Sequence, residues 1–256
     1  MWEQFSRTEM LLGSQAMQAL AAAHVAVFGV GGVGGYVVEA LARSGVGALT
    51  LVDADVVDRS NLNRQIIALL PDIGRPKVQV AAERVAAINP EAKVDCRQVF
   101  YAPDTADQFT MAAYTYVVDA IDSVPSKLAL IQQTQAAGTP IISSMGAGNK
   151  LNPMAFRVAD IYATSVCPLA RVMRQKLRRL GVAELKVVYS TEEPVRCQLL
   201  NELSESSAAG NLPPGSVAFV PSAAGLLLAA EVIKDIIAGV KNDSESGGMK
   251  NGDRRN

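Results

Sequence analysis

The 256-residue sequence has three cysteines, one histidine and few aromatic residues, which make up 5% of the chain. The cysteines, Cys96, Cys167 and Cys197, lie far apart, so the sequence contains no CxxC pair. A four-thiolate zinc site needs two such pairs, and a disulfide framework needs an even set of cysteines. The sequence therefore excludes a Cys₄ zinc site and argues against a disulfide-stapled fold.

Net charge and long hydrophobic runs are also lacking. The formal net charge is −1, so no overall field draws the chain to nucleic acid or to an anionic membrane, and an RNA contact would need a local basic patch. The most apolar late stretch, 217–240, is interrupted by Pro221, Glu231, Lys234 and Asp235, which predicts a buried helix and not a membrane span. The first residues lack a basic region followed by an apolar run, so we expect no signal peptide and a cytoplasmic protein.

The sequence does contain an alternation of short apolar runs with helical patterns. Short runs rich in β-branched residues are typical of buried parallel strands, and their alternation with helices predicts a doubly wound, Rossmann-like α/β sheet. The predicted strands are 24–30, 48–52, 94–99, 116–120 and 140–144, and the predicted helices are 14–23, 36–44, 77–88 and 126–137.

After Met145 the pattern changes. Apolar and polar residues alternate only weakly here, and the region ends in an apolar stretch, which together predict a smaller C-terminal extension that we expect to be antiparallel. Residues 191–214 are polar and contain glycine and proline, so we expect a mobile crossover loop there. Its predicted elements are a strand at 156–162, a basic helix at 168–180, a strand at 185–190 and a long helix at 222–238.

These patterns predict a single domain over residues 1–240. The main nucleotide-binding core would occupy about 20–150 and the extension about 151–240. Residues 241–256 contain no core-forming pattern, so we expect a disordered tail there.

A glycine-rich turn lies between the first predicted strand and its helix. Gly29, Gly31, Gly32 and Gly34 let the backbone approach a phosphate, and the helix N-terminus offers unpaired N–H groups. Asp53 ends the next strand, where a carboxylate accepts hydrogen bonds from ribose. These residues alone fit NAD as well as ATP.

Two cations favour a triphosphate. Arg64 follows Asn61 in the S-N-L-x-R-Q stretch, and Lys77 opens the next predicted helix after Gly-Arg-Pro. A nicotinamide enzyme has no use for such a pair, whereas β- and γ-phosphates need Arg and Lys to neutralise their charge. Asp119 and Asp122 end a later strand at the carboxyl edge of the sheet, where a carboxylate suits Mg²⁺ bound to phosphate oxygens.

These motifs, GxGGxG, D-x-D, S-N-L-x-R-Q, G-x-P-K and D-x-x-D-S, resemble in order and spacing the adenylation domain of the ThiF/MoeB/HesA superfamily, from about Phe5 to Ile237. The resemblance implies adenylation of a carboxylate by ATP with Mg²⁺. It implies that Asp53 binds ribose, that Asn61, Arg64 and Lys77 hold the phosphates, and that Asp122 binds Mg²⁺. The cofactor-binding set that we predict comprises Gly29, Gly31, Gly32, Gly34, Asp53, Asp55, Asn61, Arg64, Lys77, Asp122 and Ser123.

Arg7 matches an N-terminal arginine that reaches the ATP of the partner subunit in such dimers, which implies a homodimer with shared sites. The alternative is a surface arginine on a frayed terminus. With Arg64, Lys77 and Asp122, Arg7 completes the predicted catalytic set. The resemblance also leaves open a monovalent cation site and a cysteine desulfurase or sulfur-acceptor partner.

Within the superfamily, the sequence is most similar to the tRNA threonylcarbamoyladenosine dehydratases. It lacks the zinc pairs and appended domains of carrier-protein activators, and its Val118–Ser123, Asn89-Pro90 and Phe219–Gly225 stretches match the dehydratases. This resemblance implies adenylation of the threonyl carboxylate of the modified adenosine at position 37 of tRNA, then ring closure by the carbamoyl group with loss of AMP. Two alternatives remain: adenylation of a ubiquitin-like or sulfur-carrier C-terminus, and an NAD-dependent oxidoreductase or nucleotide-sensing protein.

The basic helix at 168–180 is the candidate tRNA contact, because clustered cations can cover phosphates. The alternative is a surface helix whose C-terminal cations are favoured by its dipole. We expect Cys167 to be a buried small residue, Cys96 to lie in the core and His24 to be structural. The candidate RNA-contact residues are Arg171, Arg174, Lys176, Arg178 and Arg179.

Overall fold

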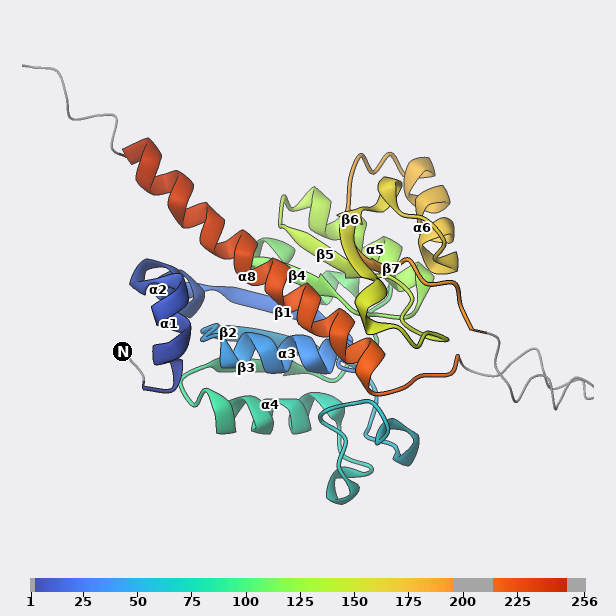
Figure 1. The fold of residues 1–256 in the computed structure, drawn as a ribbon, viewed down its shortest axis with the longest axis horizontal. Coiled ribbons are helices and arrows are strands. Elements are labelled where there is room, and N and C mark those ends of the chain that lie inside the picture. Colours follow the sequence, from blue (N-terminus) through green and yellow to red (C-terminus); the bar gives the residue numbers. More distant parts are fainter. Residues whose placement is uncertain (1–2, 196–213, 248–256) are drawn as a thin grey trace, which may run out of the picture.

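The computed structural model describes residues 3–195 and 214–247. Its strands form one sheet in the order β3-β2-β1-β4-β5-β7-β6 (Figure 1). Neighbouring strands are parallel, except for the antiparallel pair of β6 and β7. The predicted doubly wound sheet with a small antiparallel extension is confirmed. The strands are β1 (His24–Phe28), β2 (Ala48–Val52), β3 (Lys93–Arg97), β4 (Tyr116–Asp119), β5 (Ile141–Ser144), β6 (Phe156–Asp160) and β7 (Lys186–Ser190).

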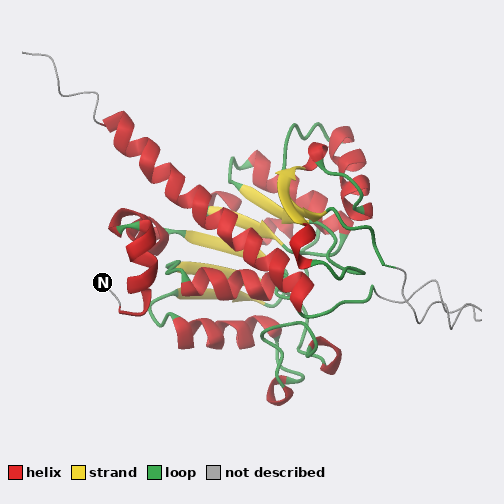
Figure 2. Cartoon of the chain, in the orientation of Figure 1, coloured by secondary structure: helices red, strands yellow, loops and turns green. Residues whose placement is uncertain are grey.

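Helices cover both faces of the sheet (Figure 2). Helices α3, α4 and α8 share a buried cluster with one face, whereas α5 packs on the other and α6 packs beside α5. The α-helices are α1 (Ser6–Leu12), α2 (Ser14–Ala22), α3 (Gly34–Arg43), α4 (Lys77–Ile88), α5 (Val124–Ala136), α6 (Pro168–Arg179) and α8 (Phe219–Gly247).

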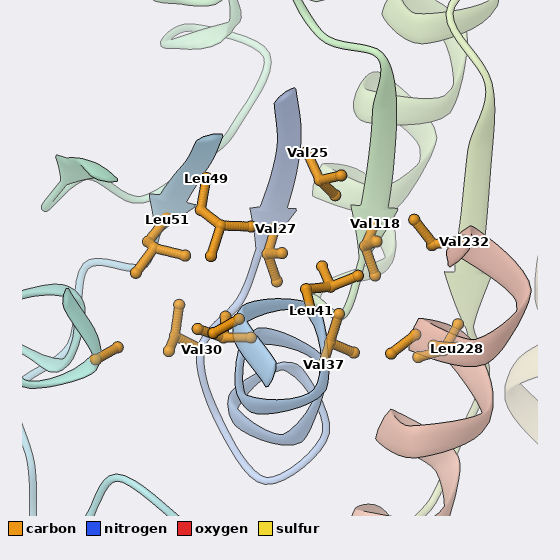
Figure 3. Close-up of a cluster of buried hydrophobic side chains, with 14 of the residues drawn as sticks. Val25, Val27, Val30, Val37, Leu41, Leu49, Leu51, Val118, Leu228 and Val232 are labelled. Carbon is orange, nitrogen blue, oxygen red and sulfur yellow. The ribbon is translucent and has the colours of Figure 1, made fainter. Parts of the chain in front are cut away.

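Strand β1 shows how the sequence builds this layered core. Its side chains point alternately to the two faces, so Val25 and Val27 join the cluster under α3 and α8, while Ala26 and Phe28 join the cluster under α5. All four are fully buried, which explains the unbroken apolar run that a two-sided strand needs. Figure 3 shows Val37 and Leu41 of α3 close to Val27 of β1 and Val118 of β4, with Leu228 and Val232 of α8 beside them.

The structure corrects two predictions. Helix α8 continues to Gly247, past the predicted end at residue 238, because each added residue of an existing helix gains a backbone hydrogen bond without a new nucleation cost. The start of the predicted disordered tail is therefore helical, while residues 248–256 lie outside the described residues. Cys96 is exposed and not in the core, because β3 is an edge strand with mostly exposed side chains.

Three further predictions concern the crossover loop, Cys167 and His24. Most of the predicted crossover loop, 196–213 with Cys197, lies outside the described residues. Cys167 is buried, as expected. His24 is structural in its contacts: its Nε2 lies 2.8 Å from the Thr50 hydroxyl, and its ring meets Tyr114 edge-on.

Across residues 3–195 and 214–247, the helices do not combine the length and the apolar character needed to cross a lipid bilayer.

Candidate functional site

A cavity of about 580 Å³ lies at the carboxyl ends of β1, β2 and β4. The strand order reverses between β1 and β4, and doubly wound sheets bind their ligands at this point. Most of the predicted site meets here from separate parts of the chain. The predicted residues that line the cavity are Gly29, Gly31, Gly32, Asp53, Asp55, Asn61, Arg64, Lys77 and Asp122.

The glycines of the turn fall into two pairs. A Cβ on Gly34 would lie 1.8 Å from the Gly29 carbonyl oxygen, and one on Gly29, whose φ is +89°, would lie 2.7 Å from the Ala120 carbonyl oxygen. These two glycines are needed for backbone packing. A Cβ on Gly31 or Gly32 would meet only side-chain atoms, at 3.7 Å and 3.4 Å, so the fold does not require glycine there. Their missing side chains leave room for a ligand above the turn.

Asp53 connects the turn to the next strand. Its Oδ2 accepts a hydrogen bond from the Val30 N–H at 2.7 Å, and its Oδ1 accepts one from the Asp55 N–H at 2.9 Å. Each carboxylate oxygen retains a second lone pair, because a carboxylate offers about four acceptor positions. The carboxylate can therefore hold the turn and accept ribose hydroxyls.

The two predicted cations face the cavity from different elements. Lys77, the first residue of α4, is almost fully buried, and its Nζ lies 2.7 Å from Oδ2 of the exposed Asp55. Arg64 donates from one guanidinium nitrogen to the Ser60 carbonyl oxygen and to the Asn63 side chain, at 2.8 Å and 2.9 Å. The Asp55 carboxylate pairs with Lys77, whereas neutral oxygens accept hydrogen bonds from Arg64, and an incoming triphosphate can replace both kinds of partner.

Asp122 brings a carboxylate to the same cavity from the loop after β4. Within the described part of the chain, there is no group of three or more His, Cys, Asp or Glu side chains that could enclose a metal ion. A single exposed carboxylate suits a metal that takes its remaining ligands from phosphates and water, which is how Mg²⁺ binds. The donor set fits Mg²⁺ carried by a nucleotide.

One end of the cavity is apolar. Val52, Val99, Phe100 and Tyr101 line it, and the Tyr101 hydroxyl donates to Gln133 Oε1 at 2.7 Å, which fixes the ring. Burial raises the pKa of Tyr101 well above its ordinary value, so the phenol stays neutral. A planar base can stack in such an environment, opposite the charged phosphate end.

Gln65 also lines the cavity, and sequence reasoning did not assign it a role. It is 7% exposed, and its Oε1 is one of two buried side-chain atoms in the described residues that lack a hydrogen-bond partner. An unsatisfied buried acceptor in a site points to a missing partner such as a ligand or a water. Its place directly after Arg64 in the S-N-L-x-R-Q stretch was the available signal.

Eight predicted residues lie outside the cavity lining, namely Gly34, Ser123, Arg7 and the five cations of α6. Gly34 packs against the Gly29 carbonyl group, and Ser123 directly precedes α5, where its hydroxyl accepts a hydrogen bond from the Ser126 hydroxyl and makes no capping bond to the helix backbone. Arg7 is exposed on α1, away from the cavity of its own chain. Arg174 is less exposed than its basic neighbours on α6, since it donates to the Thr164 carbonyl oxygen at 2.9 Å.

The remaining α6 cations face outward. The helix buries Ala170, Met173 and Leu177 and leaves Arg171, Lys176, Arg178 and Arg179 exposed. Arg178 lies over the Tyr162 ring, 5.1 Å from its centroid. A Cβ on Gly146 would lie 3.7 Å from both Cys167 Sγ and Leu169 Cβ, so α6 begins beside the loop whose next residues line the cavity.

Residues 5–254 match the ThiF family. The chain belongs to the ThiF family. Among its similar proteins is the tRNA threonylcarbamoyladenosine dehydratase of Bacillus subtilis strain 168, 42% identical over 247 residues that cover 94% of this chain and 97% of the relative. The enzyme of the same name from Escherichia coli K12 is 37% identical over 254 residues, covering 93% and 95%.

The fold of this ThiF-family chain is also that of a solved dehydratase. The crystal structure of the E. coli tRNA N6-threonylcarbamoyladenosine dehydratase in complex with ATP has a TM-score of 0.85 and 35% identity, and covers 94% of this chain and 96% of that one. The family membership and the nucleotide-bound relative agree with a cavity that has a phosphate turn, two cations and an apolar end.

Proposed function

We propose that this chain is an ATP-dependent tRNA threonylcarbamoyladenosine dehydratase. The observation that carries the proposal is the single cavity that joins the glycine turn, Asp53, Arg64, Lys77 and Asp122, in a chain that aligns with dehydratases along nearly its whole length. ThiF-family membership and that full-length similarity favour this substrate over a carrier-protein C-terminus or an NAD-dependent reaction. A tRNA substrate also agrees with the cytoplasmic location expected from the sequence.

The reaction has two steps. The threonyl carboxylate of the modified adenosine attacks the α-phosphorus of ATP, forming an acyl-adenylate and releasing pyrophosphate. The carbamoyl group then attacks the activated carbonyl carbon, closing a ring and releasing AMP, so one oxygen leaves the substrate with the AMP. An internal nucleophile is already at high effective concentration, so no enzyme thiolate is needed.

Different residues along the cavity would bind different parts of ATP. The apolar end would take the base, Asp53 the ribose, and Gly31 and Gly32 would let the backbone approach the phosphates. Arg64 and Lys77 would neutralise charge on the β- and γ-phosphates as pyrophosphate leaves. Mg²⁺, held by Asp122 and phosphate oxygens, would supply further positive charge to the same groups.

Outside the cavity, the exposed α6 cations are the proposed tRNA surface, because clustered cations can cover phosphates and α6 begins beside the loop whose next residues, Ala147 and Gly148, line the cavity. The monovalent cation and the sulfur-transfer partner remain predictions of the family resemblance.

Mass spectrometry of position-37 nucleosides in tRNA tests the function directly. In cells lacking this protein, the ring-closed nucleoside, one water lighter, should be replaced by threonylcarbamoyladenosine, and the wild-type gene should restore it. An unchanged nucleoside profile would contradict the proposal. Thermal shifts with ATP–Mg²⁺ and with NADH provide a second test, since only a ligand that binds the native state raises the melting temperature.

Arg7 gives a prediction about subunit organisation. If Arg7 completes the site of the partner subunit, Arg7→Ala and Lys77→Ala should each be inactive alone. Refolding or co-expressing them together should restore activity, because in mixed dimers one site has an intact Lys77 and receives Arg7 from the other subunit. Random pairing makes half of the dimers mixed, with half of their sites intact, so we expect about a quarter of wild-type activity. No recovery, with mixed dimers verified by affinity tags, would place Arg7 outside the site.

A further inference from the structure

The most deeply buried charges of the described residues lie directly beneath the Asp122 loop. Asp119 and Lys127 are both fully buried, and Lys127 Nζ lies 3.0 Å from Asp119 Oδ2. The same ammonium group donates to the Ser143 hydroxyl at 3.2 Å and to the Ser144 carbonyl oxygen at 2.7 Å. All three N–H donors of the lysine are therefore used inside the protein.

Stability alone gives a weak reason for such a pair. Removing two charges from water costs free energy, and well-packed apolar residues of similar size often serve a core equally well or better. The elements that carry the pair or adjoin it also carry buried apolar side chains, such as Phe28 of β1, Val117 of β4 and Leu130 of α5. The hydrogen bonds that the pair makes to neighbouring segments indicate a second role.

The pair joins three segments at the carboxyl edge of the sheet. Asp119 is the last residue of β4, Ser143 and Ser144 end β5, and Lys127 lies in the first turns of α5. The loop from Ala120 to Ser123 connects two of them. Asp119 Oδ1 accepts a hydrogen bond from the Ile121 N–H at 3.1 Å, and the backbone N–H of Lys127 donates to the Ser123 carbonyl oxygen at 3.0 Å. Asp122 thus directly follows a residue, Ile121, whose amide is hydrogen-bonded to the ion pair, and it is followed by Ser123, whose carbonyl accepts a bond of the first turn of α5.

We propose that Asp119 is a positioning residue: its Oδ1 accepts the Ile121 N–H and so holds the loop that presents Asp122 to a nucleotide-bound Mg²⁺, while Lys127 supplies the positive charge that lets the Asp119 carboxylate be buried. Asp119 is the first aspartate of the D-x-x-D stretch, and this gives it a role distinct from that of Asp122. The inference rests on the proposed function only in assuming that the cavity binds ATP with Mg²⁺. Groups that orient a metal ligand are typically worth 10–100-fold in metal affinity.

Two double variants separate positioning from simple core filling. Asp119→Asn/Lys127→Met and Asp119→Leu/Lys127→Met each remove both charges together, so neither leaves a lone buried charge. The first keeps an oxygen that can accept the Ile121 N–H, and the second does not. ATP affinity is measured by calorimetry with and without Mg²⁺ and in the absence of tRNA, with circular dichroism as the check on folding.

The wild type and the Asn variant should bind ATP more tightly with Mg²⁺. With Mg²⁺ present, the Leu variant should bind ATP about tenfold or more weakly than the Asn variant, while ATP affinity without Mg²⁺ should be the same in both. Three results would overturn the proposal: Mg²⁺ raises the ATP affinity of both variants equally, the two variants lose this increase equally, or Mg²⁺ does not raise the ATP affinity of the wild type. If the wild type shows the gain but cells lacking the protein keep ring-closed tRNA, the dehydratase proposal fails while this one stands.

Hydrogen exchange of the wild type gives a test that needs no variant. If the anchor holds the loop before any ligand binds, the Ile121 amide should exchange as slowly as the amides of β4. Exchange at the rate of an exposed loop amide would overturn the proposal, even if both double variants fail to fold.

Discussion

Replacing Gly34 by alanine is expected to lower the free energy of unfolding by about 3 kcal/mol or more. The added Cβ would lie 1.8 Å from the Gly29 carbonyl oxygen, which is backbone and cannot rotate away as a side chain can. Gly29 is itself held, since its N–H donates to the Val52 carbonyl oxygen at 2.8 Å and its own Cβ position faces the Ala120 carbonyl oxygen. The strand, the turn and the start of α3 would have to separate together.

Urea denaturation monitored by circular dichroism measures this effect, and Gly239→Ala is its matched control. Gly239 lies in α8 with open space where a Cβ would point, and its φ is not in the left-handed region. The same substitution there should raise the free energy of unfolding by up to about 1 kcal/mol, because alanine is the better helix former. Equal stability of the two variants would show that Gly34 does not pack as described.

The layout of the sheet could be predicted from the sequence because buried parallel strands leave a strong signal. Runs such as Val25 to Phe28 are apolar without interruption since both faces are covered. Helix α1 left no such signal. It buries none of its side chains, and Met10 and Leu11 are among the most exposed apolar residues described, so no periodic face distinguishes it.

The charged part of the site was predictable for a different reason. Gly31, Asp53 and Lys77 are unusual at their positions unless they meet a phosphate or a ribose, so residue type and order are informative. The sequence gives no comparable signal for Phe100 and Tyr101, because an aromatic residue after a strand can belong to the core as readily as to a binding site. That they line the cavity depends on how the chain after β3 passes over the sheet edge, which only the tertiary structure shows.

The ion pair beneath Asp122 shows a further limit. Lys127 at a helix start would ordinarily be assigned to solvent, since lysine is almost never fully buried unless it is paired. Its partner, Asp119, ends a strand that could equally have presented the carboxylate to the cavity. The parallel pairing of β4 with β5 brings Ser143 beside Asp119 and so creates the polar chamber that accepts the ammonium group. Sequence spacing alone does not contain that pairing.

Lys77→Ala should reduce kcat/KM for ATP-dependent adenylation by about 10²–10³-fold, or about 3–4 kcal/mol of transition-state stabilisation. In the structure the ammonium group is paired with Asp55 at 2.7 Å, and Lys77 lines the cavity. As pyrophosphate leaves, negative charge grows on the bridging oxygen and the β-phosphate, and a nearly buried cation stabilises that charge more than a solvated one does. Alanine leaves this charge unmatched.

The fold should tolerate this change. Lys77 begins α4, where alanine is a good helix former, and the Asp55 carboxylate that loses its partner is 69% exposed and returns to water. Lys93→Ala is the control, because Lys93 lies at the amino end of β3, on the opposite edge of the sheet. ATP–pyrophosphate exchange with the tRNA substrate should be near wild type for Lys93→Ala and almost absent for Lys77→Ala, at equal melting temperatures. If Lys77→Ala retained ATP–pyrophosphate exchange, Lys77 would not stabilise the triphosphate. The assignment of this end of the cavity as the phosphate site would then be wrong.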